Sequence, residues 1–131
     1  MSLYRASARD GVVWVTGAST GIGRELALEL ARRGWTVAAT ARSADKLTQL
    51  ETESGALKGR IFGFPADMTD ADAVAETVIR ISSELDKIVL AVFNAGNYWP
   101  ASGDRLDVKK FADTYAINVM GQVNGLVPVV E

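Results

Sequence analysis

One stretch of eight residues decides the fold: Thr16-Gly17-Ala18-Ser19-Thr20-Gly21-Ile22-Gly23. It follows an apolar run, residues 12–15, and leads directly into a helical pattern, which is the order that a dinucleotide phosphate loop requires. Gly17 allows a tight exit from the strand, Gly21 lets the backbone approach a pyrophosphate, and Gly23 allows close packing of helix on strand. Backbone amides and the positive end of the helix then hold the phosphates. The alternative is that the glycines serve only the turns.

Strand-like and helical segments alternate along the chain. Apolar runs at residues 12–16, 36–40, 60–64 and 88–93 predict strands, and the segments 21–33, 44–53, 70–85 and a long stretch from 107 predict helices. This βαβ alternation is typical of an α/β protein. Right-handed crossovers predict a Rossmann-type, doubly wound parallel sheet of order 3-2-1-4, without the later strands of the full fold.

The spacing of apolar residues predicts which helix faces are buried. In the first helix, Ile22, Leu26 and Leu30 form one stripe that we expect to pack on the sheet. The third helix opens with Thr69 and Asp72 in the spacing of a capping box.

The fourth helical stretch carries Phe111, Tyr115 and Val119 on one side. Tyr115 lies on the same helical stripe as Phe111, so it is expected to pack in the core rather than to act as a catalytic phenol. Pro128 disfavours the helix near its end.

Composition excludes several classes of function. The 131 residues predict a single domain, 1–131, and the net charge of -2 offers no electrostatic footprint for nucleic acid or an anionic membrane. Without Cys or His, the usual zinc sites and His-based triads are excluded. No apolar run is long enough to span a membrane. We therefore expect a soluble, cytoplasmic protein without a metal site.

The predicted strand order has a switch point between the first and fourth strands. Ligands of open α/β sheets bind at such a point, outside the carboxyl ends of the strands. The glycine-rich loop and Asn94-Ala95-Gly96, which follows the fourth predicted strand, would converge there. Two motifs therefore share one predicted crevice.

Together with Asp67 and Asn118, these motifs resemble the short-chain dehydrogenase/reductase family, from Val12 to the end of the chain. The resemblance implies that Asp67 and the Met68 backbone contact the adenine and that Asn118 holds a water in the proton relay of the catalytic site. It also implies that Asn94-Ala95-Gly96 steadies the central sheet and lines the cofactor ribose. The cofactor-binding candidates are Gly17, Ser19, Thr20, Gly21, Ile22, Gly23, Arg42, Ser43, Asp67, Met68, Asn94, Ala95 and Gly96.

Some of these residues also have structural explanations. Asp67 could be a solvated turn residue, and Asn118 could hydrogen-bond a kinked backbone. Tyr98 and Trp99 follow the fourth strand, where the family often builds part of its substrate pocket, but they could equally cover the core. The family often has a second Asn where this chain has Phe93.

The residues after the second strand bear on the choice of cofactor. An NAD-preferring site usually has an acidic residue there, whereas this chain has Ala41 followed by Arg42. Because a guanidinium forms charge-assisted bonds to a 2′-phosphate, NADP(H) is predicted over NAD(H), with Ser43 as an extra donor. Ser43 is also the predicted N-cap of the second helix. The alternative for Arg42 is a solvated side chain at a helix entrance.

The resemblance implies an oxidoreductase that transfers a hydride between a nicotinamide and a small alcohol or carbonyl compound. The family's Tyr, its Lys four residues on, and its Ser have no credible match in these residues, so the chain is predicted to be a truncated, cofactor-binding portion that is inactive alone. Two alternatives stay open: a non-catalytic nucleotide-binding or regulatory protein that kept the fold, and a fragment that binds nothing.

Two apolar surfaces predict self-association. The fourth strand would leave an unpaired edge along residues 88–93, without a charge inside the run. The helix with Phe111, Tyr115 and Val119 resembles one that packs between subunits in the family. A homo-oligomer, or pairing with further polypeptide, is therefore expected.

Overall fold

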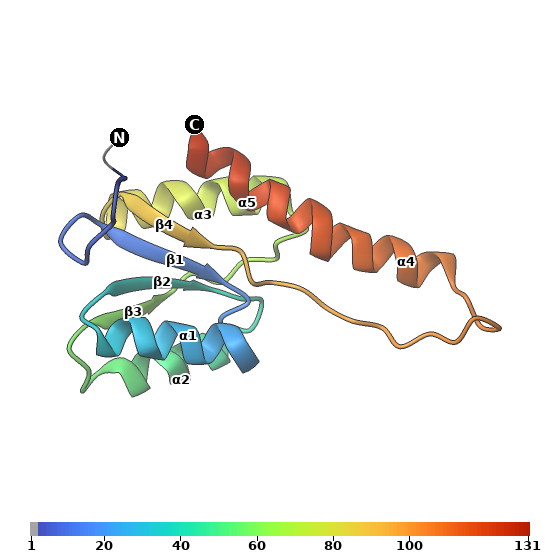
Figure 1. Cartoon of the computed structure of the whole chain (residues 1–131), viewed down its shortest axis with the longest axis horizontal. Helices are drawn as coiled ribbons and strands as arrows, with labels where there is room; N and C mark the ends of the chain where they lie inside the picture. The colour runs from blue at the N-terminus through green and yellow to red at the C-terminus, as the bar shows by residue number, and fades with distance from the viewer. Residues whose placement is uncertain (1–2) are drawn as a thin grey trace.

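The computed structural model describes residues 3–131 and contains one parallel sheet of order β3-β2-β1-β4. Figure 1 shows its four strands side by side. They are β1 (Val12–Thr16), β2 (Thr36–Thr40), β3 (Arg60–Gly63) and β4 (Ile88–Val92). The predicted α/β class and strand order are confirmed.

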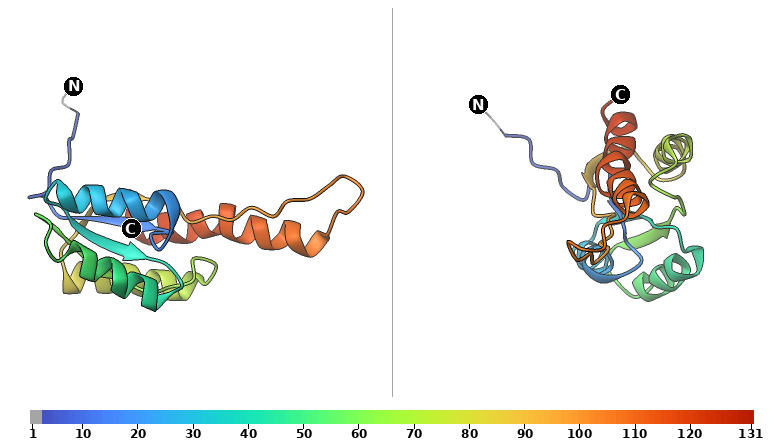
Figure 2. Two further views of the ribbon diagram at one scale, coloured as in Figure 1. Left: turned by 90° about the horizontal axis from the view of Figure 1, so that it is seen from below. Right: turned by 90° about the vertical axis from the view of Figure 1, so that its right-hand side faces the viewer.

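Helices cover both faces of this sheet (Figures 1 and 2). One face holds α1 (Gly21–Arg32) and α2 (Ala44–Ser54), and the other holds α3 (Ala71–Glu84) and α5 (Gly121–Val130). A π-helical turn, Ala116–Met120, joins α4 (Val108–Tyr115) to α5. The loop before α4, together with α4 itself, projects from the body as an arm (Figure 2).

The buried strand β1 divides its side chains between the two layers. Val13 and Val15 pack with residues of α1 and α2, whereas Val12 and Trp14 pack with residues of α3. Successive side chains of a strand point to opposite faces, so a strand that is covered on both sides is apolar throughout.

The predicted stripe of α1 is confirmed for Leu26 and Leu30, which pack against the core of this face, and is wrong for Ile22. Ile22 is 80% exposed, and Leu26 and Leu30 are only half-buried. The buried face instead includes Ala27 and Ala31. Leu28 is buried with them, and Leu26 and Leu30 pack at the margin of this face.

One predicted helix cap is confirmed and another is wrong. Ser43 caps α2, because its hydroxyl accepts a hydrogen bond from the Lys46 amide at 3.3 Å. For α3 the cap is Asp70, whose carboxylate accepts from the Ala73 amide at 3.0 Å. Thr69 donates to Asp67 instead, so the expected capping box with Asp72 does not form.

The last helical segment also differs from the prediction. Tyr115 is 57% exposed, and Phe111 and Val119 are exposed beside it, so the expected core packing of Tyr115 is wrong. Phe111 and Tyr115 lie on α4 of the arm, and Val119 lies in the π-helical turn that follows it. Pro128 does not end the helix, which continues to Val130.

Side chains of α2 cover the edge of the sheet that β3 forms. The Ile61 amide of β3 donates to the Ser54 hydroxyl at 3.0 Å, and the Gly63 amide donates to the Glu51 carboxylate. The amides of an edge strand are otherwise free to pair with another chain. Polar residues of α2 therefore take the place of a further strand.

Ser54→Ala should lower the free energy of unfolding by about 1–3 kcal/mol, because the buried Ile61 amide would lose its acceptor. The urea midpoint measures this loss. Thr52→Ala removes an exposed hydroxyl of the same helix that bonds only to the Thr48 carbonyl, and should cost about 0.5 kcal/mol or less. Equal losses for the two variants would contradict the role of Ser54.

Within residues 3–131, no helix combines the length and the apolar character needed to cross a bilayer.

Candidate cofactor-binding site

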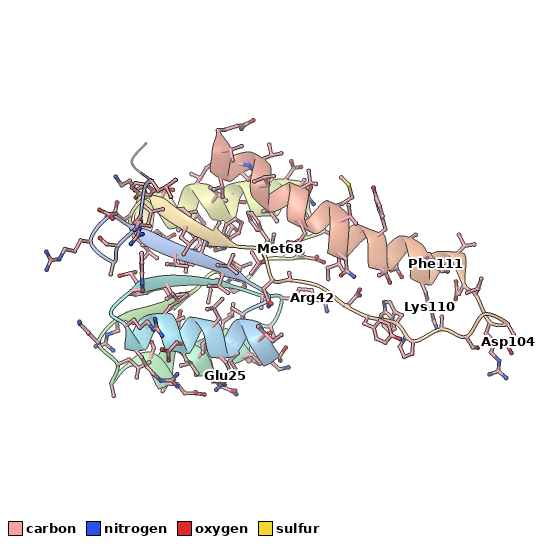
Figure 3. All side chains as sticks on the ribbon, viewed as in Figure 1. Glu25, Arg42, Met68, Asp104, Lys110 and Phe111 are labelled. Carbon is pink, nitrogen blue, oxygen red and sulfur yellow. The ribbon has the colours of Figure 1, made fainter. Side chains whose placement is uncertain are left out.

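A pocket of about 320 Å³ opens at the carboxyl ends of β1, β2 and β4. Figure 3 shows Arg42 and Met68 at this end of the sheet. The lining residues are Gly17, Ser19, Thr20, Ile22, Ala41, Arg42, Ala66, Asp67, Met68, Asn94, Ala95, Gly96 and Ile117. The structure therefore brings the glycine-rich loop and the Asn94-Ala95-Gly96 segment together at the predicted switch point.

The glycines of the loop have steric reasons for being glycines. Gly17 and Gly21 have φ values of +64° and +56°, which side chains other than glycine rarely adopt. A Cβ on Gly23 would collide with the Gly17 carbonyl oxygen and lie 2.5 Å from Asn94 Nδ2. Gly23 therefore lets α1 begin directly against the loop and the end of β4.

The first turn of α1 has no side-chain cap. The side chains of Ser43, Asp70 and Asp107 cap α2, α3 and α4, whereas Thr20 makes no such bond for α1. The first turn of α1 also contains no acidic residue. The amides of a helix N-terminus need acceptors, and together with the helix dipole they favour an anion. This turn borders the pocket, so it is open to a phosphate.

Thr16 joins the two loops. Its hydroxyl oxygen, at the end of β1, accepts hydrogen bonds from the amides of Asn94 at 3.0 Å and Ala95 at 3.1 Å. The Asn94 side chain in turn donates to the Gly17 carbonyl at 3.2 Å. These bonds fix the wall after β4 against the glycine-rich loop.

Asp67 lies in a tight turn at the rim. Its carboxylate accepts from the Thr69 amide at 2.9 Å and from the Thr69 hydroxyl at 2.8 Å. These bonds, chiefly that of the Thr69 amide, with a smaller contribution from the charge of Arg42, hold the pKa of Asp67 below its ordinary value. Asp67 is thus both a turn residue and a pocket residue, an anionic acceptor near Arg42.

Asn118 lies in the π-helical turn and does not line the pocket. Its side chain accepts from the Asn97 amide and donates to the Asn97 carbonyl, both at 2.8 Å. Asn118 therefore ties the loop after β4 to the helix, and its neighbour Ile117 forms part of the pocket wall.

Three other predicted site residues, Gly21, Gly23 and Ser43, do not line the pocket. They shape the glycine-rich loop and the starts of α1 and α2 instead.

Sequence reasoning missed some residues of the site. Ala41, Ala66 and Ile117 line the pocket without any polar signal. Gln122 and Asn124 also support it from α5, because their amides donate to the carbonyls of Ala95 at 2.6 Å and Met68 at 2.9 Å. No sequence motif marks such bonds, because the acceptors are backbone atoms distant in sequence.

Phe93 and the loop aromatics lie outside the pocket lining. Phe93 packs edge to face on Trp14, with ring centroids 5.7 Å apart, so it serves packing where the family often has Asn. Tyr98, which is 82% exposed, and Trp99 do not cover the core. They line a separate hollow of about 300 Å³ beside Lys110 and Phe111 of the arm.

Comparison with known proteins now assigns the family. A family model described as short chain dehydrogenase matches residues 11–131. The chain belongs to the short-chain dehydrogenase family. It is 34% identical over 119 residues to mouse dehydrogenase/reductase SDR family member 7, covering 88% of this chain and 35% of that protein. It is 37% identical over 120 residues to the NADPH-dependent pterin aldehyde reductase of Arabidopsis thaliana, covering 87% and 47%.

Solved structures of short-chain dehydrogenases have the same fold as this chain. The alcohol dehydrogenase of the archaeon Thermococcus sibiricus, complexed with 5-hydroxy-NADP, superposes with a TM-score of 0.86 at 28% identity, over 92% of this chain and 52% of that one. The chain thus spans roughly a third to a half of the length of these short-chain dehydrogenases. Members of the family use nicotinamide cofactors and small alcohol or carbonyl substrates.

Proposed function

We propose that this chain is a single cofactor-binding domain, residues 1–131, of an oxidoreductase that interconverts an alcohol and a carbonyl compound and prefers NADP(H). The observation that carries the proposal is the uncapped start of α1 behind a glycine-rich loop, at the edge of a pocket. A dinucleotide pyrophosphate supplies the acceptors that this helix start lacks.

Each part of the cofactor has residues that fit it. The pyrophosphate would lie on the glycine-rich loop, with the hydroxyls of Ser19 and Thr20 nearby. Asp67 and the Met68 backbone would contact the adenine, and Asn94-Ala95-Gly96 would line a ribose. We also propose that Asn118 contributes to the proton relay, because its side chain holds the loop after β4 in place. When bound, the nicotinamide supplies or accepts the hydride.

The preference for NADP(H) rests on Arg42. Its side chain is exposed at the pocket rim and forms no ion pair with any residue of the described range 3–131. A free guanidinium can bind a 2′-phosphate through charge-assisted hydrogen bonds. Two similar proteins support this choice: the Arabidopsis reductase is NADPH-dependent, and the Thermococcus dehydrogenase was solved in complex with 5-hydroxy-NADP.

Titration and turnover of the intact protein test the proposal. We expect NADP(H) to bind and a panel of ketones, aldehydes and alcohols to include a substrate. Residues 1–131 alone should show no turnover, because they lack a Tyr with a Lys four residues on. Cofactor binding without turnover by the intact protein would favour the non-catalytic, regulatory alternative, and no binding would reject both. A rate from residues 1–131 that Asn118→Ala abolishes would contradict the expected inactivity.

We further propose a homo-oligomer that uses the arm. Phe111, Tyr115 and Val119 are exposed on one helical segment, and Figure 3 shows Phe111 at the outer end of α4. An exposed apolar face of this kind marks an interaction surface. Phe111→Glu should therefore shift the mass of the intact protein in light scattering towards the monomer. The matched change Ile79→Glu, at an exposed apolar residue of α3, should leave the mass unchanged. A monomeric wild-type protein would contradict the proposal.

A further inference from the structure

We propose that Trp14 is a positioning residue that joins the two strand ends flanking β1 and thereby strengthens the 2′-phosphate preference that Arg42 gives the pocket. This inference rests on the proposed binding of NADP(H). Trp14 lies on the central strand, has no exposed surface and is the largest fully buried side chain of the described residues. It lies on the α3 side of the sheet, and it is not part of the pocket lining.

On one side, Trp14 holds the end of β2. Its Nε1 donates a hydrogen bond to Thr40 Oγ1 at 2.9 Å, between two buried side chains that are 26 residues apart. Thr40 is the last residue of β2, and its carbonyl accepts from the Ala18 amide of the glycine-rich loop at 3.1 Å. Arg42 follows two residues later. The indole thus fixes the strand end from which Arg42 emerges.

On the other side, Trp14 holds the end of β4. The planes of the Trp14 and Phe93 rings are 87° apart, an edge-to-face contact. Phe93 directly precedes Asn94 of the opposite pocket wall. A methyl group on Gly125 of α5 would lie 2.6 Å from Phe93 Cε1, so Phe93 is wedged between Trp14 and α5. A displacement of Trp14 would therefore reach both walls.

The residues beside Trp14 on the neighbouring strands are small and leave room for the indole. The cross-strand neighbours of Trp14 are Ala38 on β2 and Ala91 on β4. A smaller aromatic ring at this position would keep the contact with Phe93 but would lose the donor to Thr40. The end of β2 would then be less well fixed, and the guanidinium of Arg42 would lose part of its alignment with a 2′-phosphate.

Two nucleotides isolate this effect from the rest of the cofactor: adenosine 2′,5′-bisphosphate and 5′-AMP, which differ only in the 2′-phosphate. Calorimetry on the intact protein gives their affinity ratio. Trp14→Phe should reduce the preference for the bisphosphate by about fivefold, the effect of one neutral hydrogen bond. Trp35→Phe is the matched control, because Trp35 is half-buried just before β2, at the opposite end of this strand from Thr40. It should lower stability and leave the ratio unchanged.

Substitutions of Thr40 test the same bond without changing the aromatic ring. Thr40→Val removes the acceptor at nearly constant volume and should reduce the ratio as Trp14→Phe does, whereas Thr40→Ser keeps the hydroxyl oxygen and should retain the wild-type ratio. These variants decide the question if Trp14→Phe does not fold. An affinity ratio that stays at the wild-type value in both Trp14→Phe and Thr40→Val would overturn the role of Trp14. Equal binding of the two nucleotides by the wild-type protein would instead overturn the proposed NADP(H) preference itself.

Discussion

Gly23→Ala should lower the affinity of the intact protein for NADP(H) by roughly 100-fold or more. A Cβ at this position would meet the Gly17 carbonyl oxygen and the Asn94 amide group, so the loop and the start of α1 must move apart. Hydrogen bonds to charged groups contribute about 1.5–3 kcal/mol each, so the loss of one or two amide contacts to the pyrophosphate accounts for a change of this size. The fluorescence of bound NADPH measures it.

Gly103→Ala is the control for this substitution, because a Cβ there meets nothing within 4 Å. It should leave affinity and stability near the wild-type values. Gly21→Ala measures the effect of backbone strain without a steric collision. A Cβ at Gly21 also has open space, but the φ of +56° is unfavourable for alanine by about 1–2 kcal/mol. An affinity for Gly23→Ala within threefold of wild type would contradict the proposed phosphate loop.

The sheet and the phosphate loop were predictable from local signals. The strands are short, apolar runs that are covered on both faces, and the glycines of the loop are required by backbone geometry, so each signal lies within a few residues. The face of α1 was only partly predictable in this way. It centres on Ala27, Leu28 and Ala31, and a search for large apolar residues at helical spacing wrongly adds Ile22, which lines the pocket.

The supports of the site were less predictable, because they connect residues that are distant in sequence. The side chain of Asn118 bonds to the backbone of Asn97, 21 residues away, and the hydroxyl of Thr16 bonds to amides 78 and 79 residues further along. A backbone acceptor or donor leaves no mark on the residue type that carries it. The resemblance to a family suggested that Asn118 belongs near the site, but only the structure shows which segment it holds.

Arg42→Ala should remove most of the cofactor preference by weakening the binding of NADP(H) about 30-fold while changing that of NAD(H) by less than about twofold. The guanidinium of Arg42 is free of ion pairs within the described part of the chain, so its charge is available to a 2′-phosphate. A charge-assisted contact contributes about 2 kcal/mol, which corresponds to this ratio. Fluorescence titration with each reduced cofactor measures the two affinities.

Arg33→Ala is the matched control, since it removes an exposed guanidinium at the far end of α1, where it pairs with Glu29 rather than facing the pocket. It should leave both affinities unchanged. The double variant Ala41→Asp, Arg42→Ala goes one step further, because a carboxylate after β2 accepts a hydrogen bond from the ribose 2′-hydroxyl and repels a 2′-phosphate. It should prefer NAD(H). If Arg42→Ala weakens both cofactors equally, Arg42 contacts a group that they share, and the 2′-phosphate assignment is wrong.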